Sequence, residues 1–209
     1  MPVASVMLCL AEKHLDFEFV HVDMAKGEHK SHQFLSKNPF GKIPAFEDEP
    51  LTLFESRAIT GYIAHKYRDI GTDLLRHDKI EESAMVGVWI EVESQHFTPP
   101  KISYIAIIHE VFVGPLIGRT TDQSVVNLNV EKLDKVLDVY EARLSTSKYL
   151  ACDSFSLADL HHLSYIYYLM KITPCADLIN SRPHVKAWWE DISARPSFVK
   201  VVQGLTLGE

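Results

Sequence analysis

The spacing of hydrophobic residues predicts an α/β module in the first third of the chain. Four apolar residues recur at helical spacing and predict an opening helix to about Lys13: Val3, Val6, Met7 and Leu10. Aromatic and β-branched residues over 17–22 predict a strand. The further elements expected are a short helix capped by Ser31, two short strands and a helix, over 31–37, 45–47, 51–54 and 56–67.

The pattern changes to helices alone after the polar stretch 68–73. A helix is expected over 80–97, with one apolar face formed by Ile80, Ala84, Val88 and Val92. Apolar residues at alternating spacings of four and three predict a second helix over 126–144. Ser156 and Asp159 form a capping-box pattern that opens a third, to about Met170. Two final helices are expected over 183–193 and after Pro196.

These patterns divide the chain into an α/β domain over 1–68, a linker over 69–79 and an all-helical domain over 80–209. With 46% hydrophobic residues, the chain can bury a sizeable core. A net charge of −7 argues against nucleic acid or an anionic membrane as a partner. The longest apolar runs, such as 105–108, are far shorter than a membrane span.

The cysteines and the opening residues bear on the compartment. Cys9, Cys152 and Cys175 are odd in number and have no paired spacing, which predicts free thiols in a reducing compartment. The opening MPVASVMLCLAEK lacks the basic start of a secretory signal. We therefore expect a cytoplasmic protein.

Several motifs resemble the phi class of plant glutathione transferases. They are GEHKSHQFLSKNPFGKIPAFEDE, LTLFESRAITGYIAHKY, KVLDVYEARL, YLACDSFSLADLHHL and HVKAWWEDISARP, and they cover almost the whole chain in order. The resemblance implies a thioredoxin-like domain that binds glutathione, a helical domain that lines the electrophile pocket, and a homodimer. Glutathione would be a co-substrate, with no cofactor and no metal.

Ile43 and Pro44 lie in a motif where the resemblance implies a cis-proline. A cis bond there would turn the backbone N–H and C=O of Ile43 toward the cysteinyl part of glutathione, which would pair with them like a strand edge. The alternative is an ordinary loop proline, and the flanking motif favours the ligand site.

Glu55 and Ser56 lie where a strand passes into a helix. Ser56 is a natural N-cap, and the N-terminus of a helix attracts anions. The resemblance implies that Ser56 binds the γ-glutamyl carboxylate, while Glu55 faces the amino group. Ordinary helix capping is the alternative, and the two roles are compatible.

His29, Lys30 and Lys42 would supply positive charge to the glycine carboxylate of glutathione, according to the same resemblance. The alternative is solvated surface charge, and only their positions in GEHK and NPFGKIP favour binding. Arg57 would orient the loop or form a structural salt bridge, and Asp159 is expected to act in folding. Phe97, Ile107 and Phe112 are weaker candidates for the electrophile pocket.

The chain departs from the phi pattern at its start. VMLCLAEK matches the first helix of the family, which places the first strand and the catalytic serine before Met1. Ser5 falls about a turn too late for that role, and helix capping or plain exposure is the expectation for it. Cys9 is expected to be a buried small hydrophobe. Without the first strand, two neighbouring strands would lose their partner.

Three functions follow from these observations. The first is an enzyme that adds glutathione to small hydrophobic electrophiles in detoxification and stress responses. The second is a non-catalytic carrier of glutathione or hydrophobic ligands, favoured by the absent serine. The third, a cysteine-based thiol transferase, needs a cysteine at the start of the first helix, and Cys9 lies too deep within it. The sequence identifies neither the electrophile nor any hydroperoxide reduction.

Overall fold

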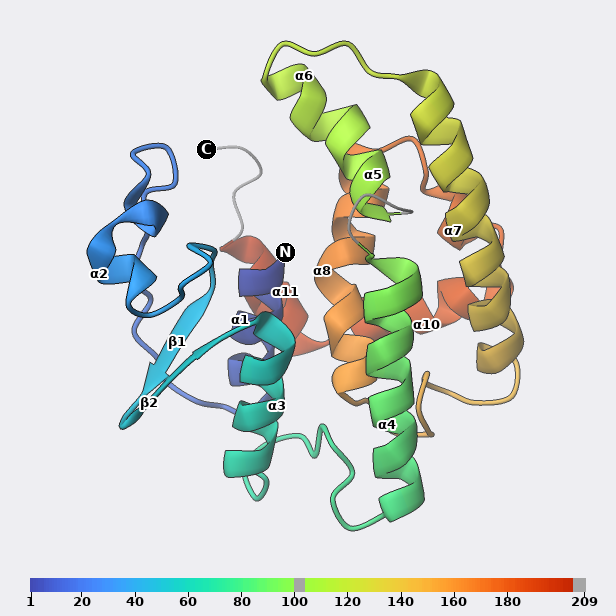
Figure 1. The fold of residues 1–209 in the computed structure, drawn as a ribbon. Coiled ribbons are helices and arrows are strands. Elements are labelled where there is room, and N and C mark those ends of the chain that lie inside the picture. The colour runs from blue at the N-terminus through green and yellow to red at the C-terminus, as the bar shows by residue number, and fades with distance from the viewer. Residues whose placement is uncertain (100–103, 205–209) are drawn as a thin grey trace.

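The computed structural model describes residues 1–99 and 104–204, which form two parts packed side by side (Figure 1). The first part consists of α1 (Pro2–Glu12), the 3₁₀ turn η1 (Glu28–Lys30), α2 (His32–Leu35), β1 (Ala45–Asp48), β2 (Leu51–Phe54) and α3 (Ser56–Lys66). The second part is helical. Its elements are α4 (Ile80–Val92), the π-helical turn η2 (Glu93–Phe97), α5 (Tyr104–Ile108), the π-helical turn η3 (His109–Val113), α6 (Gly114–Leu116), α7 (Gln123–Leu144), α8 (Leu157–Ile172), α9 (Asp177–Asn180), α10 (Pro183–Ser193) and α11 (Pro196–Gln203).

Two predicted helix starts, those of α2 and α8, are confirmed by their capping bonds. The Ser31 hydroxyl accepts a hydrogen bond from the Phe34 amide at 3.2 Å at the start of α2. Ser156 and Asp159 form the predicted capping box of α8. Asp159 is fully buried and also accepts from the indole N–H of Trp188 at 2.9 Å, so it acts in folding as expected. Burial raises the pKa of Asp159 to about 6, against the opposing effect of these hydrogen bonds.

The β-hairpin is fastened to α3 through one carboxylate. β1 and β2 pair antiparallel, with Ala45 opposite Phe54 and Asp48 opposite Leu51. Asp48 accepts hydrogen bonds from three side chains in or just after α3: Lys66 at 2.6 Å, Tyr62 at 3.1 Å and Tyr67 at 3.0 Å. These bonds fix the far end of the hairpin against the C-terminal half of the helix.

The strand predicted over 17–22 is wrong. This segment is irregular and mostly exposed, and the only sheet in the described part of the chain contains β1 and β2. A strand is stable when its N–H and C=O groups pair with a neighbour, and no described strand runs beside this one. High β-propensity alone does not form a strand there.

The apolar face predicted for α4 lies mainly on the surface rather than in the core. Ile80 is 73% exposed and Val88 50% exposed, whereas Val86 and Trp89 of the same helix are buried in the core. The helix therefore packs on one apolar stripe and leaves a second one on the surface. In contrast, all but one of the apolar positions predicted for α7 are fully buried, the exception being half-buried Val130.

One hydrophobic core spans both parts of the molecule. It includes Leu8 and Cys9 of α1, Ile59 and Ile63 of α3, and buried residues of α4, α7, α8 and α10. α1 contacts α3 on one side and α8 and α11 on the other. Cys9 is completely buried as predicted, and burial raises the pKa of its thiol to about 12. Cys9, Cys152 and Cys175 are all free thiols.

Glu12, at the end of α1, ties this helix to the C-terminal helices. Its carboxylate accepts two hydrogen bonds from the Arg195 guanidinium at 2.7 Å and one from Thr72 at 2.6 Å, and a further one from Ser197. Burial by itself would raise the pKa of Glu12, but the bonds from Arg195, Ser197 and Thr72 outweigh it and lower the pKa.

We expect Glu12→Gln to lower the free energy of unfolding at pH 7 by about 2–4 kcal/mol, because the partly buried Arg195 loses its charged partner. The folded-state pKa of Glu12 lies below its unfolded value, about 4.3. The stabilisation is therefore fully present above the unfolded pKa and is lost as the pH falls through the folded pKa. Urea unfolding at pH 7 and pH 3 measures it, with exposed Glu18→Gln as the control. A wild-type advantage over Glu12→Gln that is equal at both pH values would contradict this account.

Candidate functional site

The hairpin register brings two of the predicted site segments together. Because Ala45 pairs with Phe54, the preceding Pro44 lies next to Glu55, which follows β2. The Ile43–Pro44 bond is cis, as predicted. The backbone N–H and C=O of Ile43 make no hydrogen bond within the described part of the chain. They are therefore available to an extended ligand laid beside this segment.

Glu55 has an unusual backbone conformation at the start of α3. Its φ is 68° and its ψ is 110°, which is costly for a residue with a side chain. Glu55 is the N-cap residue and Ser56 is the first residue of the helix, so the prediction of Ser56 as N-cap is wrong by one position. The reason is that the strained turn falls on Glu55, which lets Ser56 adopt helical geometry.

The N-terminus of α3 has the features of an anion site. No side chain caps it, and the first intrahelical bond runs from the Ile59 amide to the Glu55 carbonyl at 3.0 Å. The amides before Ile59 are thus free to meet a ligand, and the hydroxyl of half-exposed Ser56 has no partner among the described residues. A helix of this length presents partial positive charge at its start, which suits a carboxylate.

The three predicted cationic residues differ in what they do. The Lys30 ammonium donates to the carbonyls of Phe40 and Gly41 at 3.2 and 2.9 Å, so it holds the loop that leads to Ile43. Gly41 has a φ of 56°, and a Cβ there would lie 2.7 Å from the His29 carbonyl, so the two backbones pack closely. The side chain of Lys42 is exposed and unpaired within the described chain.

His29 is half-buried, and its Nδ1 atom is buried without a hydrogen-bond partner in the described structure. Since its carbonyl packs against Gly41, His29 belongs to the same surface as Lys42 and Ile43. The structure therefore connects all seven predicted binding residues through one continuous path: His29, Lys30, Lys42, Ile43, Pro44, Glu55 and Ser56. This surface has the unpaired ammonium of Lys42 and the imidazole of His29 at one end, an open backbone segment in the middle and a helix N-terminus at the other.

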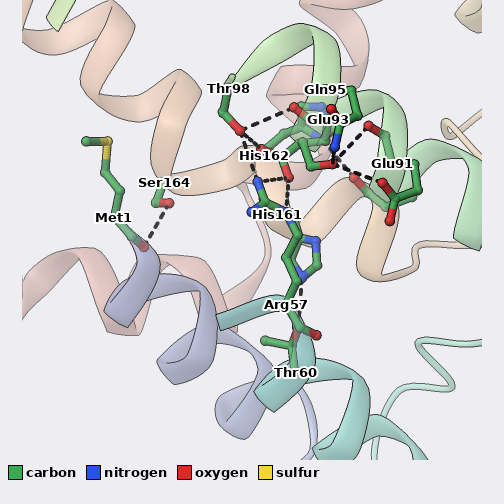
Figure 2. Close-up of polar contacts among 12 residues, drawn as sticks. Met1, Arg57, Thr60, Glu91, Glu93, Gln95, Thr98, His161, His162 and Ser164 are labelled. Carbon is green, nitrogen blue, oxygen red and sulfur yellow. Dashed lines mark hydrogen bonds and ion pairs between the residues drawn. The ribbon is translucent and has the colours of Figure 1, made fainter. Parts of the chain in front are cut away.

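An ion pair between Arg57 and a buried carboxylate joins this surface to the second part of the molecule (Figure 2). Arg57, the second residue of α3, donates from Nε to the Glu93 carboxylate at 2.8 Å, and one of its terminal nitrogens lies 2.6 Å from the same carboxylate oxygen. The same guanidinium donates to the Thr98 hydroxyl at 3.0 Å, and Thr98 donates to Glu93 at 2.5 Å. Burial raises the pKa of Glu93, and the charge of Arg57 opposes that rise.

Glu93 and Thr98 were not predicted as site residues. A usable signal exists in the helix pattern: Val86, Trp89 and Glu93 follow one another at spacings of three and four, so Glu93 lies on the buried stripe of α4. A charged residue at such a position requires a buried partner. The sequence does not show that this partner is Arg57. One of the two roles predicted for Arg57 was a structural salt bridge, and its ion pair with Glu93 is such a bridge.

The adjacent histidines have separate partners on different helices. The Thr60 hydroxyl donates to the Arg57 carbonyl at 3.1 Å, so it accepts from His161 Nε2 at 2.9 Å. His162 donates from Nδ1 to the Ala158 carbonyl at 2.7 Å and accepts from the Tyr140 hydroxyl at 2.9 Å. Burial lowers the pKa of both imidazoles to about 3, so both are neutral. His161 thereby links α3 to α8 next to Arg57.

Two other predictions concern residues in or next to the core. Ser5 is neither a cap nor exposed, because it lies buried within α1 and Met1 is the N-cap. Phe97 and Ile107 are fully buried and stand in the core, whereas Phe112 is half-buried. Trp188 and Trp189 are also buried.

In residues 1–99 and 104–204, no helix combines the length and the apolar character that a membrane crossing requires. Within the same residues, no group of three or more His, Cys, Asp or Glu side chains is placed to hold a metal ion.

Comparison with known proteins identifies the chain. Residues 1–65 match the model of the glutathione S-transferase N-terminal domain, and residues 104–196 match that of its C-terminal domain. Glutathione S-transferase F13 of Arabidopsis thaliana is 56% identical over 98% of this chain and 92% of its own length. Glutathione S-transferase PARB of Nicotiana tabacum is 53% identical over 96% of this chain and 92% of its own length.

Solved structures show the same fold. The crystal structure of glutathione transferase F7 from Populus trichocarpa superposes with a TM-score of 0.93, at 57% identity over 99% of this chain and 95% of that one. Glutathione S-transferase I from mais, in complex with an atrazine glutathione conjugate, superposes with a TM-score of 0.89. The two chains are 47% identical over 97% of this chain and 92% of that one. The chain therefore belongs to the glutathione S-transferase family, as a member of the plant phi class, with a thioredoxin-like N-terminal domain and a helical C-terminal domain.

Proposed function

We propose that this protein is a glutathione transferase that conjugates reduced glutathione to small hydrophobic electrophiles. The observation that carries the proposal is the open N-terminus of α3, beside the unpaired backbone of Ile43. The relatives above are named glutathione S-transferases, and one solved structure contains a glutathione conjugate. The role of such a reaction would be detoxification, in the cytoplasm, which suits the free thiols of the chain.

Glutathione fits the surface from end to end. We place its γ-glutamyl carboxylate at the free amides and hydroxyl at Ser56, with Glu55 facing the amino group. The cysteinyl backbone would pair with Ile43, after Pro44. His29 and Lys42 would meet the glycine carboxylate, and Lys30 would hold the loop between them. Residues 1–68 would thus form the glutathione domain, 69–79 the linker, and 80–209 the domain that lines the electrophile site.

The residues of this chain act in the reaction by binding and orienting glutathione. The conjugation needs a thiolate, and a free thiol near pKa 8.5 is mostly protonated at neutral pH. Ser5 does not serve as the hydroxyl that stabilises this thiolate, because it is buried within α1. Fixing both ends of the tripeptide holds its sulfur in one place, which is the contribution of the described site.

We expect Ser56→Ala and Glu55→Ala each to weaken glutathione binding by about 1–3 kcal/mol, because a charged end of the ligand loses its partner. Calorimetric titration with reduced glutathione measures this, and an assay of conjugation to an aryl halide measures the loss in kcat/KM. Ser124→Ala is the control, since Ser124 also lies in the first turn of a helix. Unchanged affinity in both variants would place the site elsewhere, and binding without conjugation would favour a carrier.

Lys42 and Lys30 provide a second test. Lys42→Met should weaken glutathione binding roughly two- to fivefold at low salt and leave the melting temperature unchanged, because Lys42 acts only as an exposed charge. Lys30→Met should lower the melting temperature, because two loop carbonyls lose their donor. Calorimetry at two salt concentrations and thermal unfolding separate the two effects. Equal changes in glutathione affinity and in melting temperature in the two variants would show that Lys42 has no role separate from that of Lys30.

We also propose a homodimer, assembled through α4 of one protomer and the N-terminal domain of its partner. Ile80, Ala84 and Val88 form an exposed apolar stripe on α4, and such stripes mark interfaces. Val88→Asp should shift the mass measured by light scattering at micromolar concentration from dimer toward monomer. Val139→Asp, at a similarly exposed valine of α7, should leave the mass unchanged. A monomeric wild-type protein would refute the proposal.

A further inference from the structure

We propose that His65 and His77 form a binding site for a divalent transition-metal ion where α3 passes into the segment that leads to α4. His65 lies in the last turn of α3, and His77 follows in the connecting segment. Their rings meet through Nδ1 of His65 and Nε2 of His77, which are 2.9 Å apart. The pair lies about 14 Å along the helix from Ser56, so the inference goes beyond the proposed function.

The separation of the two nitrogens is one that adjacent metal ligands require. A metal–imidazole bond is about 2.0–2.1 Å long, so two ligand nitrogens at a right angle are about 2.8–3.0 Å apart. The observed 2.9 Å falls in this range. The ring planes of His65 and His77 lie 65° apart, with their centroids 4.8 Å from each other, so the rings are not stacked. A small rotation of each ring turns both lone pairs onto one ion while the nitrogens keep their separation.

Asp73 orients His77 for this role. His77 Nδ1 lies 3.4 Å from the Asp73 carboxylate, at ion-pair distance but outside hydrogen-bond geometry, and is buried with no hydrogen-bond partner in the described structure. A neutral imidazole carries one proton, which the carboxylate favours at Nδ1, so that the lone pair of Nε2 faces His65. Carboxylates beside the second nitrogen orient metal-binding imidazoles in the same way.

The turn that carries His77 is held in place without an ion. Asp73 accepts a hydrogen bond from the Arg76 amide at 2.9 Å, and the Arg76 guanidinium donates to Glu82 of α4 at 2.7 Å. His65 is fixed by its position in α3, whose last carbonyls carry partial negative charge that suits a cation. Two ligands that are already in place lose little conformational entropy when they bind.

The surroundings of the pair admit a cation from solvent. His65 is exposed, and the side chain of His77 is 14% exposed. The charge of the neighbouring Lys66 is compensated by Asp48, and that of Arg76 by the two carboxylates named above. Water would complete the coordination. Two protein ligands therefore suffice for reversible binding, although the described residues contain no group of three or more.

The geometry favours Cu²⁺ and Ni²⁺ over Zn²⁺. Imidazole suits all three ions, but Cu²⁺ and Ni²⁺ take tetragonal arrangements with right angles between ligands. Zn²⁺ prefers tetrahedral angles, for which the two nitrogens would have to lie about 3.3–3.4 Å apart. Mg²⁺ requires oxygen ligands and should not bind. Ni²⁺ is the suitable probe, because Cu²⁺ oxidises thiols and the chain has three free cysteines.

Calorimetric titration of the full chain with Ni²⁺, without a histidine tag, tests the site. The wild-type protein should bind a single ion. His65→Gln and His77→Gln should each weaken the binding by more than about tenfold, and Asp73→Asn by about tenfold, as the loss of an orienting carboxylate does. His109→Gln, at a half-exposed histidine of η3, and Cys152→Ser, at a free thiol, are the controls and should bind as the wild type does.

Two further measurements locate the ion. Ni²⁺ should raise the melting temperature of the wild-type protein by mass action and leave those of His65→Gln and His77→Gln unchanged. Substoichiometric Ni²⁺, which is paramagnetic, should broaden the ring proton signals of these two histidines before those of the others. A wild-type protein that binds no Ni²⁺, full affinity in either variant, or an equal loss in His109→Gln would overturn the inference. A protein that binds no glutathione would refute the proposed function and leave these results unaffected.

Discussion

The first turn of α3 is held between a β-strand on one side and a buried ion pair on the other. Glu55 follows directly after β2 and has a strained backbone conformation. Two residues later, the Arg57 side chain donates a hydrogen bond to Glu93. These two supports lie on either side of Ser56 and of the free amides at the start of the helix. The anion site proposed at Ser56 would thus be a property of the whole molecule, although its atoms belong to a few consecutive residues.

The hairpin contributes the second half of this geometry. Its register sets Pro44 beside Glu55, which brings the open backbone of Ile43 next to the helix N-terminus. Asp48 fastens the other end of the hairpin to α3 through Lys66 and two tyrosines. The hairpin and α3 therefore move together, and a ligand that bridges them meets a surface already in place, which lowers the entropic cost of binding.

Two buried carboxylates connect the α/β part to the helical part. Glu12 pairs with Arg195 and Glu93 pairs with Arg57, each with a threonine hydroxyl as an additional donor. Burying a charge is costly, and a buried pair adds less stability than apolar packing of the same volume often would. Such pairs instead fix one orientation of the α/β part relative to the helical part. The apolar core that runs through both parts provides the stability, and the two pairs define how α1 and α3 meet the C-terminal helices.

The sequence by itself determined the helices, the hairpin and most of the ligand surface. Apolar spacing, capping residues and prolines act locally, so α7, the α8 capping box and the start of α10 could be predicted from them. The motifs around Pro44 and Ser56 identified the family and predicted seven binding residues. Tertiary structure decided the rest. The segment 17–22 is not a strand because pairing requires a neighbour, and the exposed stripe of α4 depends on which face meets the core. Glu93 and Thr98 reach Arg57 across 36 and 41 positions of sequence, through a π-turn that depends on contacts distant in sequence.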